Sequence, residues 1–177
     1  MRKLCLFIGV CAVTSMLATA GVSRAQQPPK PGPEHEQLKQ LEGIWEANAN
    51  IGGQESKGTM TYKMDLGGMW LIGNFEGEFG GQKFTGRGMD SYDPNSKKFV
   101  SIWIDSMSAR PMISEGTFDP EKKTMTMTGE GPGQDGKTAK YKSVLEFKDK
   151  DSKTNTMYTI ADGKEQQMMT INYKRKG

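Results

Sequence analysis

The sequence of 177 residues is poor in the residues that build redox and metal sites, with two cysteines and one histidine. Both cysteines, Cys5 and Cys11, lie in the first 25 residues, and the single histidine is His35. A Ser-His-Asp triad or a histidine-based zinc site in the later part of the chain is therefore excluded. The chain beyond residue 11 cannot form a disulfide, although an oxidising compartment would permit one. We predict no metal and no cofactor.

Long hydrophobic runs are also scarce, since the one sustained run is Leu4 to Leu17. Arg2 and Lys3 precede this run and small residues up to Ala25 follow it, which is the pattern of a secretory signal peptide. The run is shorter than the about 20 residues that span a membrane. We predict that residues 1–25 are removed and that the mature protein has no membrane span. Its predicted location is secreted or periplasmic.

The mature chain has no excess of charge of either sign. Residues 1–25 contain three basic and no acidic residues, so the remaining basic residues equal the 21 Asp and Glu. A balanced charge argues against nucleic acid as a partner. The roughly 150 remaining residues suit one domain with a single core. The sequence leaves the oligomeric state open.

Half of the prolines, and the helical periodicity, lie at the start of the mature chain. Residues 26–33 contain four of the eight prolines and predict an extended tether. Residues 34–41 have helix-forming composition, with Leu38 and Leu41 on one face. So short a helix is not stable alone in water. We expect it to dock as a plug at one end of the fold.

From Trp45 onward, apolar and polar residues alternate over short runs, which predicts antiparallel strands with one buried face. Turn residues interrupt the runs at regular intervals and predict nine or ten strands, with a further bend at Arg110-Pro111. We predict an all-β, calycin-like barrel over residues 34–177. The turn signals are Gly52-Gly53, Leu66-Gly67-Gly68, Gly80-Gly81, Asp93-Pro94, Asp119-Pro120, Asp135-Gly136, Asp149-Lys150 and Asp162-Gly163.

The buried face can be assigned where the alternation is regular. The run from Phe99 to Ile104 is apolar on both faces, so we expect it to be covered on the outside as well. The residues predicted to face inward elsewhere are Trp45, Ala47, Ala49, Ile51, Met60, Tyr62, Met64, Leu71, Phe75, Phe79, Met125, Met127, Tyr141, Leu145, Phe147, Met169, Ile171 and Tyr173.

Gly43-Ile44-Trp45 on the first strand resembles the opening of lipocalins and fatty-acid-binding proteins. In those barrels the tryptophan closes one end, and a basic side chain of the last strand covers it. Arg175 lies two residues beyond Tyr173, on the inward face of the last strand, and is placed to stack on Trp45. We expect Gly43, Trp45 and Arg175 to be structural.

Five stretches in order and at similar spacing resemble an uncharacterised family of bacterial secreted proteins with a domain of unknown function. The resemblance covers roughly residues 34–176 and implies a calycin-like barrel without an assigned activity. The stretches are Leu38-x-x-Leu41-x-Gly43-x-Trp45, Leu66-Gly67-Gly68-Met69-Trp70-Leu71, Phe84-Thr85-Gly86 to Tyr92-Asp93, Trp103 to Met107, and Glu115 to Asp119.

Eleven methionines remain after the signal peptide, and several alternate onto the inward face. Methionine lines adaptable apolar pockets and also ligates Cu(I), although it equally replaces leucine in a packed core. Asp105 and Arg87 would orient a polar ligand head if they met inside the barrel. The candidate ligand-binding residues are Met60, Tyr62, Met64, Phe75, Arg87, Trp103, Asp105, Met125, Met127, Met169 and Tyr173.

No catalytic constellation stands out. Asp149-x-Asp151-Ser152 lacks the glycine and the distal glutamate of an EF-hand loop, so it is interpreted as a turn. The leading hypothesis is a non-enzymatic barrel that binds a small apolar or amphipathic ligand. The alternatives are a structural or interaction module with a filled core, and an enzyme that uses sparse groups such as Asp105 with a tyrosine.

Overall fold

The computed structural model describes residues 30–79, 81–133 and 136–177. The predicted signal peptide and residues 26–29 of the predicted tether lie outside this range. The described elements are one α-helix, a short 3-10 helix and ten strands. They are α1 (Pro33–Lys39), β1 (Gly43–Ile51), β2 (Gln54–Asp65), η1 (Leu66–Gly68), β3 (Trp70–Phe79), β4 (Gln82–Asp93), β5 (Lys98–Asp105), β6 (Ser108–Asp119), β7 (Thr124–Pro132), β8 (Thr138–Phe147), β9 (Ser152–Ala161) and β10 (Lys164–Arg175).

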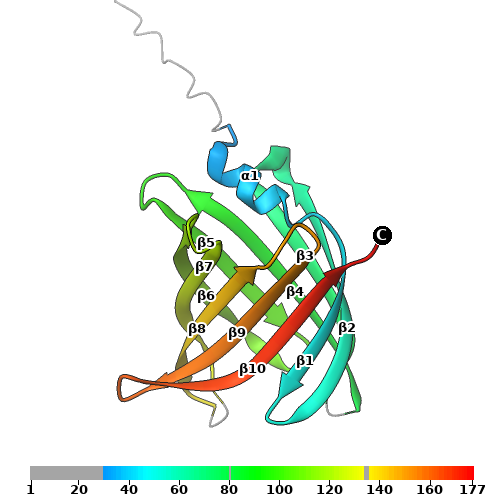
Figure 1. Cartoon of the computed structure of the whole chain (residues 1–177). Helices are drawn as coiled ribbons and strands as arrows, with labels where there is room; N and C mark the ends of the chain where they lie inside the picture. The colour runs from blue at the N-terminus through cyan, green and yellow to red at the C-terminus, as the bar shows by residue number, and fades with distance from the viewer. Residues whose placement is uncertain (1–29, 80, 134–135) are drawn as a thin grey trace, which may run out of the picture.

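The strands form a closed antiparallel barrel (Figure 1). Each strand pairs with its neighbour in sequence, and β1 pairs with β10 to close the sheet. Closure leaves no strand edge open to pairing with another chain. The predicted all-β barrel of nine or ten strands is confirmed.

The alternation of the sequence determines which side chains face inward. Trp45 is 1% exposed and pairs with Met60 on β2 and Arg175 on β10, while its neighbour Glu46 is exposed. Ala47 pairs with Tyr173, which is also buried. The register thus places the predicted inward residues of neighbouring strands opposite one another.

Helix α1 covers one end of the barrel (Figure 1). Leu38 is 1% exposed and packs with Leu41 against Leu71, Phe99 and inward methionines of the barrel. The plug predicted from residues 34–41 is confirmed as a helix, with bounds shifted slightly towards the N-terminus. No helix in the described ranges is long and apolar enough to cross a membrane.

Two details of the predicted strands are wrong. The chain reverses at Ser106-Met107, whereas Arg110 and Pro111 lie within β6. Pro111 has no N–H to donate, and the β5–β6 pairing is irregular next to it, between Trp103 and Asp105. The turn is therefore made by Ser106 and Met107, which precede the proline.

The second wrong detail is the outside of β5, which no described element covers. Val100, Ile102 and Ile104 face outward there, and Ile102 pairs with Ile113 of β6. Ile104 is 42% exposed and Ile113 is 57% exposed. No described element lies over these side chains, so the apolar character of this run does not indicate a covering layer.

Candidate ligand site in the barrel lumen

The end of the barrel beneath α1 is filled with close-packed side chains. Met60 is 3% exposed, Leu71 is fully buried and Phe99 is 4% exposed. The Nε1 of Trp45 donates a hydrogen bond of 2.8 Å to the carbonyl oxygen of Leu41, which connects the core to the end of the helical segment. This end, which we call the helix end, has no room for a ligand of useful size.

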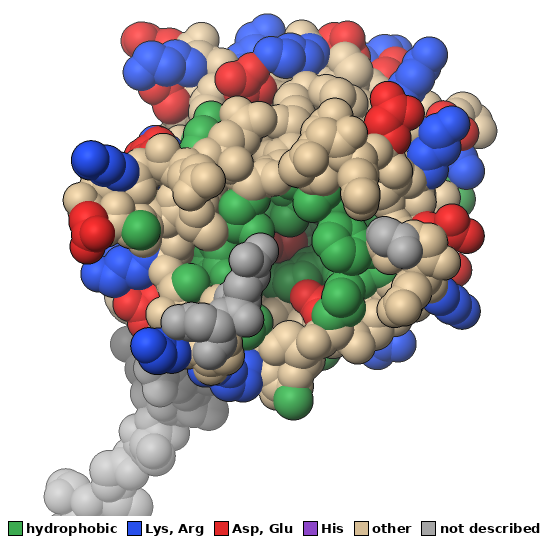
Figure 2. Space-filling view, turned by 90° about the horizontal axis from the view of Figure 1, so that it is seen from below, with side chains coloured by type: hydrophobic (Ala, Val, Ile, Leu, Met, Phe, Trp, Pro, Cys, Tyr) green, Lys and Arg blue, Asp and Glu red, His purple; other side chains and the backbone are tan. Residues whose placement is uncertain are grey.

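The opposite end is hollow, and we call it the mouth. Figure 2 looks into it and shows a depression lined by hydrophobic side chains, with acidic atoms at depth. Residues on inward positions here remain partly exposed, unlike those of the helix end. They include Phe75, Trp103, Met112, Ser143, Met157, Met169 and Ile171.

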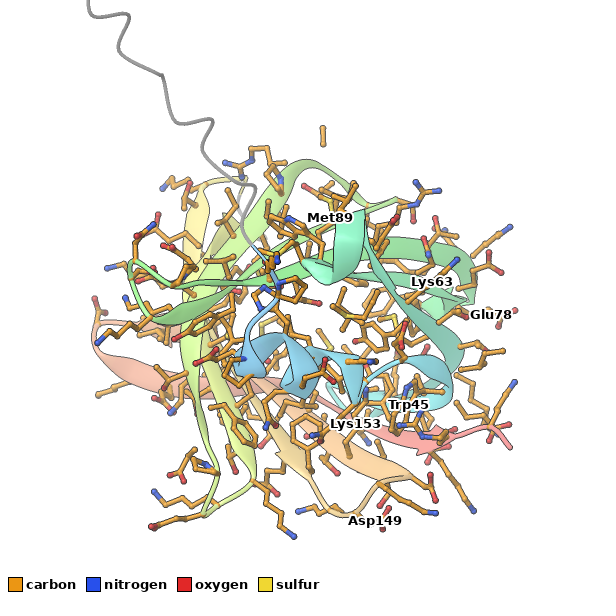
Figure 3. All side chains as sticks on the ribbon, turned by 90° about the horizontal axis from the view of Figure 1, so that it is seen from above. Trp45, Lys63, Glu78, Met89, Asp149 and Lys153 are labelled. Carbon is orange, nitrogen blue, oxygen red and sulfur yellow. The ribbon has the colours of Figure 1, made fainter. Side chains whose placement is uncertain are left out.

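Lys153 of β9 is a buried cation at the helix end. It is 2% exposed, and its Nζ lies 3.9 Å from the ring centre of Trp45, 4.6 Å from that of Tyr62 and 5.1 Å from that of Tyr173. Figure 3 shows Lys153 beside Trp45, with Lys63 and Glu78 at the periphery. In the described part of the chain, Nζ has no hydrogen-bond partner.

Burial lowers the pKa of Lys153 to about 7. The positive charge of Arg175 contributes to this lowered pKa, while the negative charge of Asp90 acts in the opposite direction. The aromatic rings supply the favourable contacts that the ammonium group would otherwise obtain from water. Because burial opposes the charged form, keeping Lys153 protonated lowers the stability of the folded chain.

Arg175 covers Trp45 from β10, as the sequence predicts. Its Cζ lies 4.1 Å from the ring centre of Trp45. The guanidinium group donates hydrogen bonds to the carbonyl oxygens of Gln40, Glu42 and Lys150, and it lies 3.3 Å from Asp151. These contacts use the donors of Arg175 to join α1, β1 and the β8–β9 turn.

Asp90 of β4 is a half-buried carboxylate between the helix end and the mouth. It lies opposite Leu71 on one side and Ser101 on the other, and Ser101 is its hydrogen-bond partner. Burial raises the pKa of Asp90 to about 6, although the Ser101 hydrogen bond and the charge of Lys153 oppose the rise. No lysine or arginine nitrogen of the described residues lies within 4.0 Å of this carboxylate.

A stripe of small polar residues continues across the inner wall from Asp90. Ser101 pairs with Ser114 of β6, which pairs with Gly129 of β7. One layer away, the Ser143 hydroxyl donates a 2.6 Å hydrogen bond to the side-chain oxygen of Asn155. The side chains of β1 and β10 opposite are largely apolar, so the lumen offers both a polar and an apolar wall.

Of the predicted ligand residues, three methionines lie in packed clusters. Met60 is 3% exposed, while Met125 and Met127 are each 8% exposed. Met64 packs against the cluster beneath α1, and Tyr62 and Tyr173 surround Lys153. Phe75, Trp103 and Met169 hold inward positions and remain partly exposed, although Phe75 and Trp103 also pack against the buried cluster around Trp45.

Arg87 and Asp105 do not meet. Arg87 pairs with Asn74 and Ile104 on the outward face of β4 and is exposed. Asp105 holds an inward position and accepts a 3.0 Å hydrogen bond from Nε1 of Trp103. The sheet separates the two charges, so Asp105 orients an indole ring instead of pairing with an arginine.

Asp90 and Lys153 are the inward charges that the sequence interpretation missed. The pattern Gly86, Gly88, Asp90 and Tyr92 places Asp90 on the same face as the partly buried Tyr92, but the glycines hide the alternation. Lys153 and Asn155 likewise share a face with Met157. Extending the alternation backwards from Tyr92 and Met157 would have found both.

A second hollow lies on the outer surface. This outer groove has a volume of about 810 Å³ and extends over β5 to β9. Its apolar lining includes Val100, Ile102, Ile113 and Ile160, and Glu130 and Lys140 lie beside them. Nothing in the structure shows what covers this groove.

The chain belongs to the family described as "Protein of unknown function (DUF1579)", which matches residues 30–175. This confirms the resemblance to an uncharacterised family. No curated protein matches the chain.

Two solved structures show the same fold. Rv2717c from M. tuberculosis superposes with a TM-score of 0.58 at 12% identity, covering 82% of this chain and 99% of that one. The S-type phycobiliprotein lyase CPES from Guillardia theta superposes with a TM-score of 0.57 at 13% identity, covering 81% and 93%. At these identities the likeness extends to the barrel and not to the site.

Proposed function

We propose that this member of the DUF1579 family binds a small amphipathic molecule in the lumen of its barrel. One observation carries the proposal: inward side chains are sealed at the helix end but remain accessible at the mouth. A module with a filled core would bury inward residues along the whole barrel. Ligand sites in barrels are expected at such mouths, with mostly apolar walls and a few polar groups.

The two walls of the lumen favour an amphipathic over a purely apolar ligand. Phe75, Ile171 and Met169 offer apolar surface, and burying it contributes roughly 25 cal/mol for each Å² removed from water. Asp90, with the serines beyond it, offers hydrogen-bonding groups on the opposite side. A purely apolar ligand would leave these polar groups without water or a partner, which is unfavourable.

We also propose that the protein acts outside the cytoplasm, because residues 1–25 have the pattern of an export signal. The intact mass of the protein recovered from its own host tests this. A mass that corresponds to cleavage after Ala25 is expected. A retained N-terminus or a lipid on Cys11 would contradict it.

Titration with a neutral fluorescent probe, phenylnaphthylamine, tests lumen binding. The fluorescence should rise on mixing with the mature protein, since the probe leaves water for an apolar site. Ser114→Phe places a ring in the lumen and should abolish the rise. Thr128→Phe is the matched control, because Thr128 lies on the outside and lines the outer groove.

The two variants also separate the two hollows. Loss of probe binding in Thr128→Phe with retention in Ser114→Phe would place the probe in the outer groove and reject the lumen proposal. Absence of any probe response in the wild-type protein would favour a structural module.

A further inference from the structure

A carboxylate and an aromatic ring lie near each other on the inner wall above the mouth. A Cβ atom placed on Gly88 would lie 3.8 Å from Oδ2 of Asp90, and 3.5 Å and 3.8 Å from Cε3 and Cζ3 of Trp103. Asp90 Oδ2 and the six-membered ring of Trp103 therefore border the same point above Gly88. Both residues hold inward positions on the adjacent strands β4 and β5.

Trp103 is held flat against β4. A Cβ atom on Gly86 would lie 2.2 Å from Cζ2 of Trp103, so a side chain at this position would displace the ring. The hydrogen bond from Nε1 to Asp105 fixes its other edge. One face of the indole thus covers the strand, and the ring also packs against the buried cluster around Trp45 while Trp103 remains partly exposed.

We propose that Asp90 and Trp103 together bind the cationic head of an amphipathic organic amine, whose apolar part occupies the rest of the lumen. This inference rests on the proposed function and names its ligand class. A carboxylate supplies a charge-assisted contact, and an indole face attracts organic cations, including quaternary ammonium groups. Both groups act more strongly where water is largely excluded.

The opposite orientation, an anionic head directed at Lys153, lacks a contact surface. The Nζ of Lys153 has less than 1 Å² of accessible area and is enclosed by Trp45, Tyr62 and Tyr173. An anion would have to displace these rings to reach it. Asp90 and Trp103 retain exposed surface and need no such movement.

Two other charges near the lumen, those of Arg175 and Asp105, are already occupied. Arg175 bonds to three backbone carbonyls and to Asp151, and Asp105 bonds to Trp103 and to the backbone N–H of Met107. Lys153 attracts Asp90 from behind the rings without a direct contact. Asp90 is therefore the inward carboxylate that an incoming cation can still pair with.

Calorimetric titration of the mature wild-type protein with three ligands of one chain length tests the inference. These are decyltrimethylammonium, decanol and decyl sulfate, each below its critical micelle concentration. The charges of decyltrimethylammonium and decyl sulfate do not depend on pH, so a change of pH alters only the protonation of the protein. The cation should bind about tenfold more tightly than decanol, and the sulfate should bind most weakly.

Two variants locate the effect. Asp90→Asn keeps the shape of the side chain and should remove the preference for the cation while decanol binding persists. Glu78→Gln changes the same charge on the outside of β3 and should leave the preference intact. If Asp90→Asn fails to bind decanol as well, Trp103→Leu decides, since it should also reduce the cation preference.

The outcomes separate this inference from the proposed function. Equal binding of the three ligands, or tighter binding of the sulfate, overturns the amine assignment while leaving a lumen carrier. A cation preference that survives both Asp90→Asn and Trp103→Leu also overturns it. Failure of all three ligands to bind rejects the carrier itself.

Discussion

The helix end and the mouth are built from the same ten strands with the same alternation, yet one is filled and the other is hollow. At the helix end, large inward residues such as Trp45, Leu71 and Phe99 meet α1. Towards the mouth, β6 to β8 present Ser114, Gly129 and other small residues inward. Strand alternation therefore builds the barrel, whereas the size of the inward residues decides where a lumen remains.

Aromatic residues contribute to the hollow by lying against glycines. A Cβ on Gly58 would lie 2.3 Å from Phe75, and one on Gly73 would lie 2.7 Å from Tyr62. Gly86 accommodates the ring of Trp103 in the same way. Each of these rings fits against the wall because a glycine of the neighbouring strand has no side chain there. This arrangement compensates for glycine's lack of packing surface within strands.

Of the substitutions that compare the helix end with the mouth, Trp45→Ala should have the largest effect on the free energy of unfolding. Removing a buried aromatic side chain costs about 3–5 kcal/mol, and this change also removes the contacts of Arg175 and Lys153. Trp103→Ala at the partly exposed mouth should cost clearly less. Urea unfolding of both variants, with Glu46→Ala as the exposed control, measures the difference. Equal losses for the two tryptophans would mean that the mouth is packed as tightly as the helix end.

Two matched substitutions that enlarge an inward alanine should have the next largest effect on the free energy of unfolding. Ala47 is 1% exposed at the helix end, whereas Ala139 is a half-buried inward residue near the mouth. Ala47→Leu should cost about 1–3 kcal/mol through overpacking, while Ala139→Leu has room to be accommodated. Thermal or urea unfolding distinguishes them. A large loss for Ala139→Leu would contradict the open lumen.

Much of the fold could be predicted because it depends on local signals. Alternation from Trp45 to Ile51 and paired turn residues such as Gly52-Gly53 are visible in the sequence. The sequence predicts a bend at Arg110-Pro111, because proline is a strong turn signal. The chain instead turns at Ser106-Met107, and β6 accommodates Pro111 beside an irregular pairing.

The candidate site was only partly predictable. The contact of Trp45 with Arg175 follows from the first strand meeting the last. Asp90 and Lys153 were missed because a charge on an inward position interrupts the apolar pattern that identifies that face. The approach of Asp90 to Trp103 depends on Gly88, and only three-dimensional packing reveals it.

The third prediction concerns pH, because the two buried charges titrate differently from exposed groups. Between pH about 7 and 10, the unfolded chain keeps a proton on Lys153 that the folded chain has lost, since an unfolded lysine has a pKa of about 10.4. The unfolded state then binds more protons, so the free energy of unfolding contributed by Lys153 rises with pH. The slope is at most about 1.4 kcal/mol for each pH unit.

Asp90 acts in the opposite direction at lower pH. Between pH about 4 and 6, the folded chain keeps a proton on Asp90 that the unfolded chain has lost, so this contribution falls as pH rises. Burial raises the pKa of Tyr62 and of Tyr173 above the ordinary value of tyrosine, so these two neighbours do not titrate in either window.

Urea unfolding across pH 4 to about 9.5, compared between wild type, Lys153→Met and Asp90→Asn, isolates the two contributions. Lys153→Met should flatten the rise above neutral pH, and Asp90→Asn should flatten the fall below it. Parallel curves for wild type and Lys153→Met would show that the amine at the helix end is not desolvated.

The smallest effect on stability is expected for Arg87→Ala, which tests whether the ligand binds inside the barrel or on its outer face. Arg87 is exposed on the outward face of β4, directly between the inward Gly86 and Gly88. Arg87→Ala should change the free energy of unfolding by no more than about 0.5 kcal/mol and leave decyltrimethylammonium binding unchanged. Arg175→Ala is the contrasting change, because it removes bonds to Gln40 and Glu42 and should lower stability measurably. A marked loss of ligand binding in Arg87→Ala would show that the outer face, and not the lumen, holds the ligand.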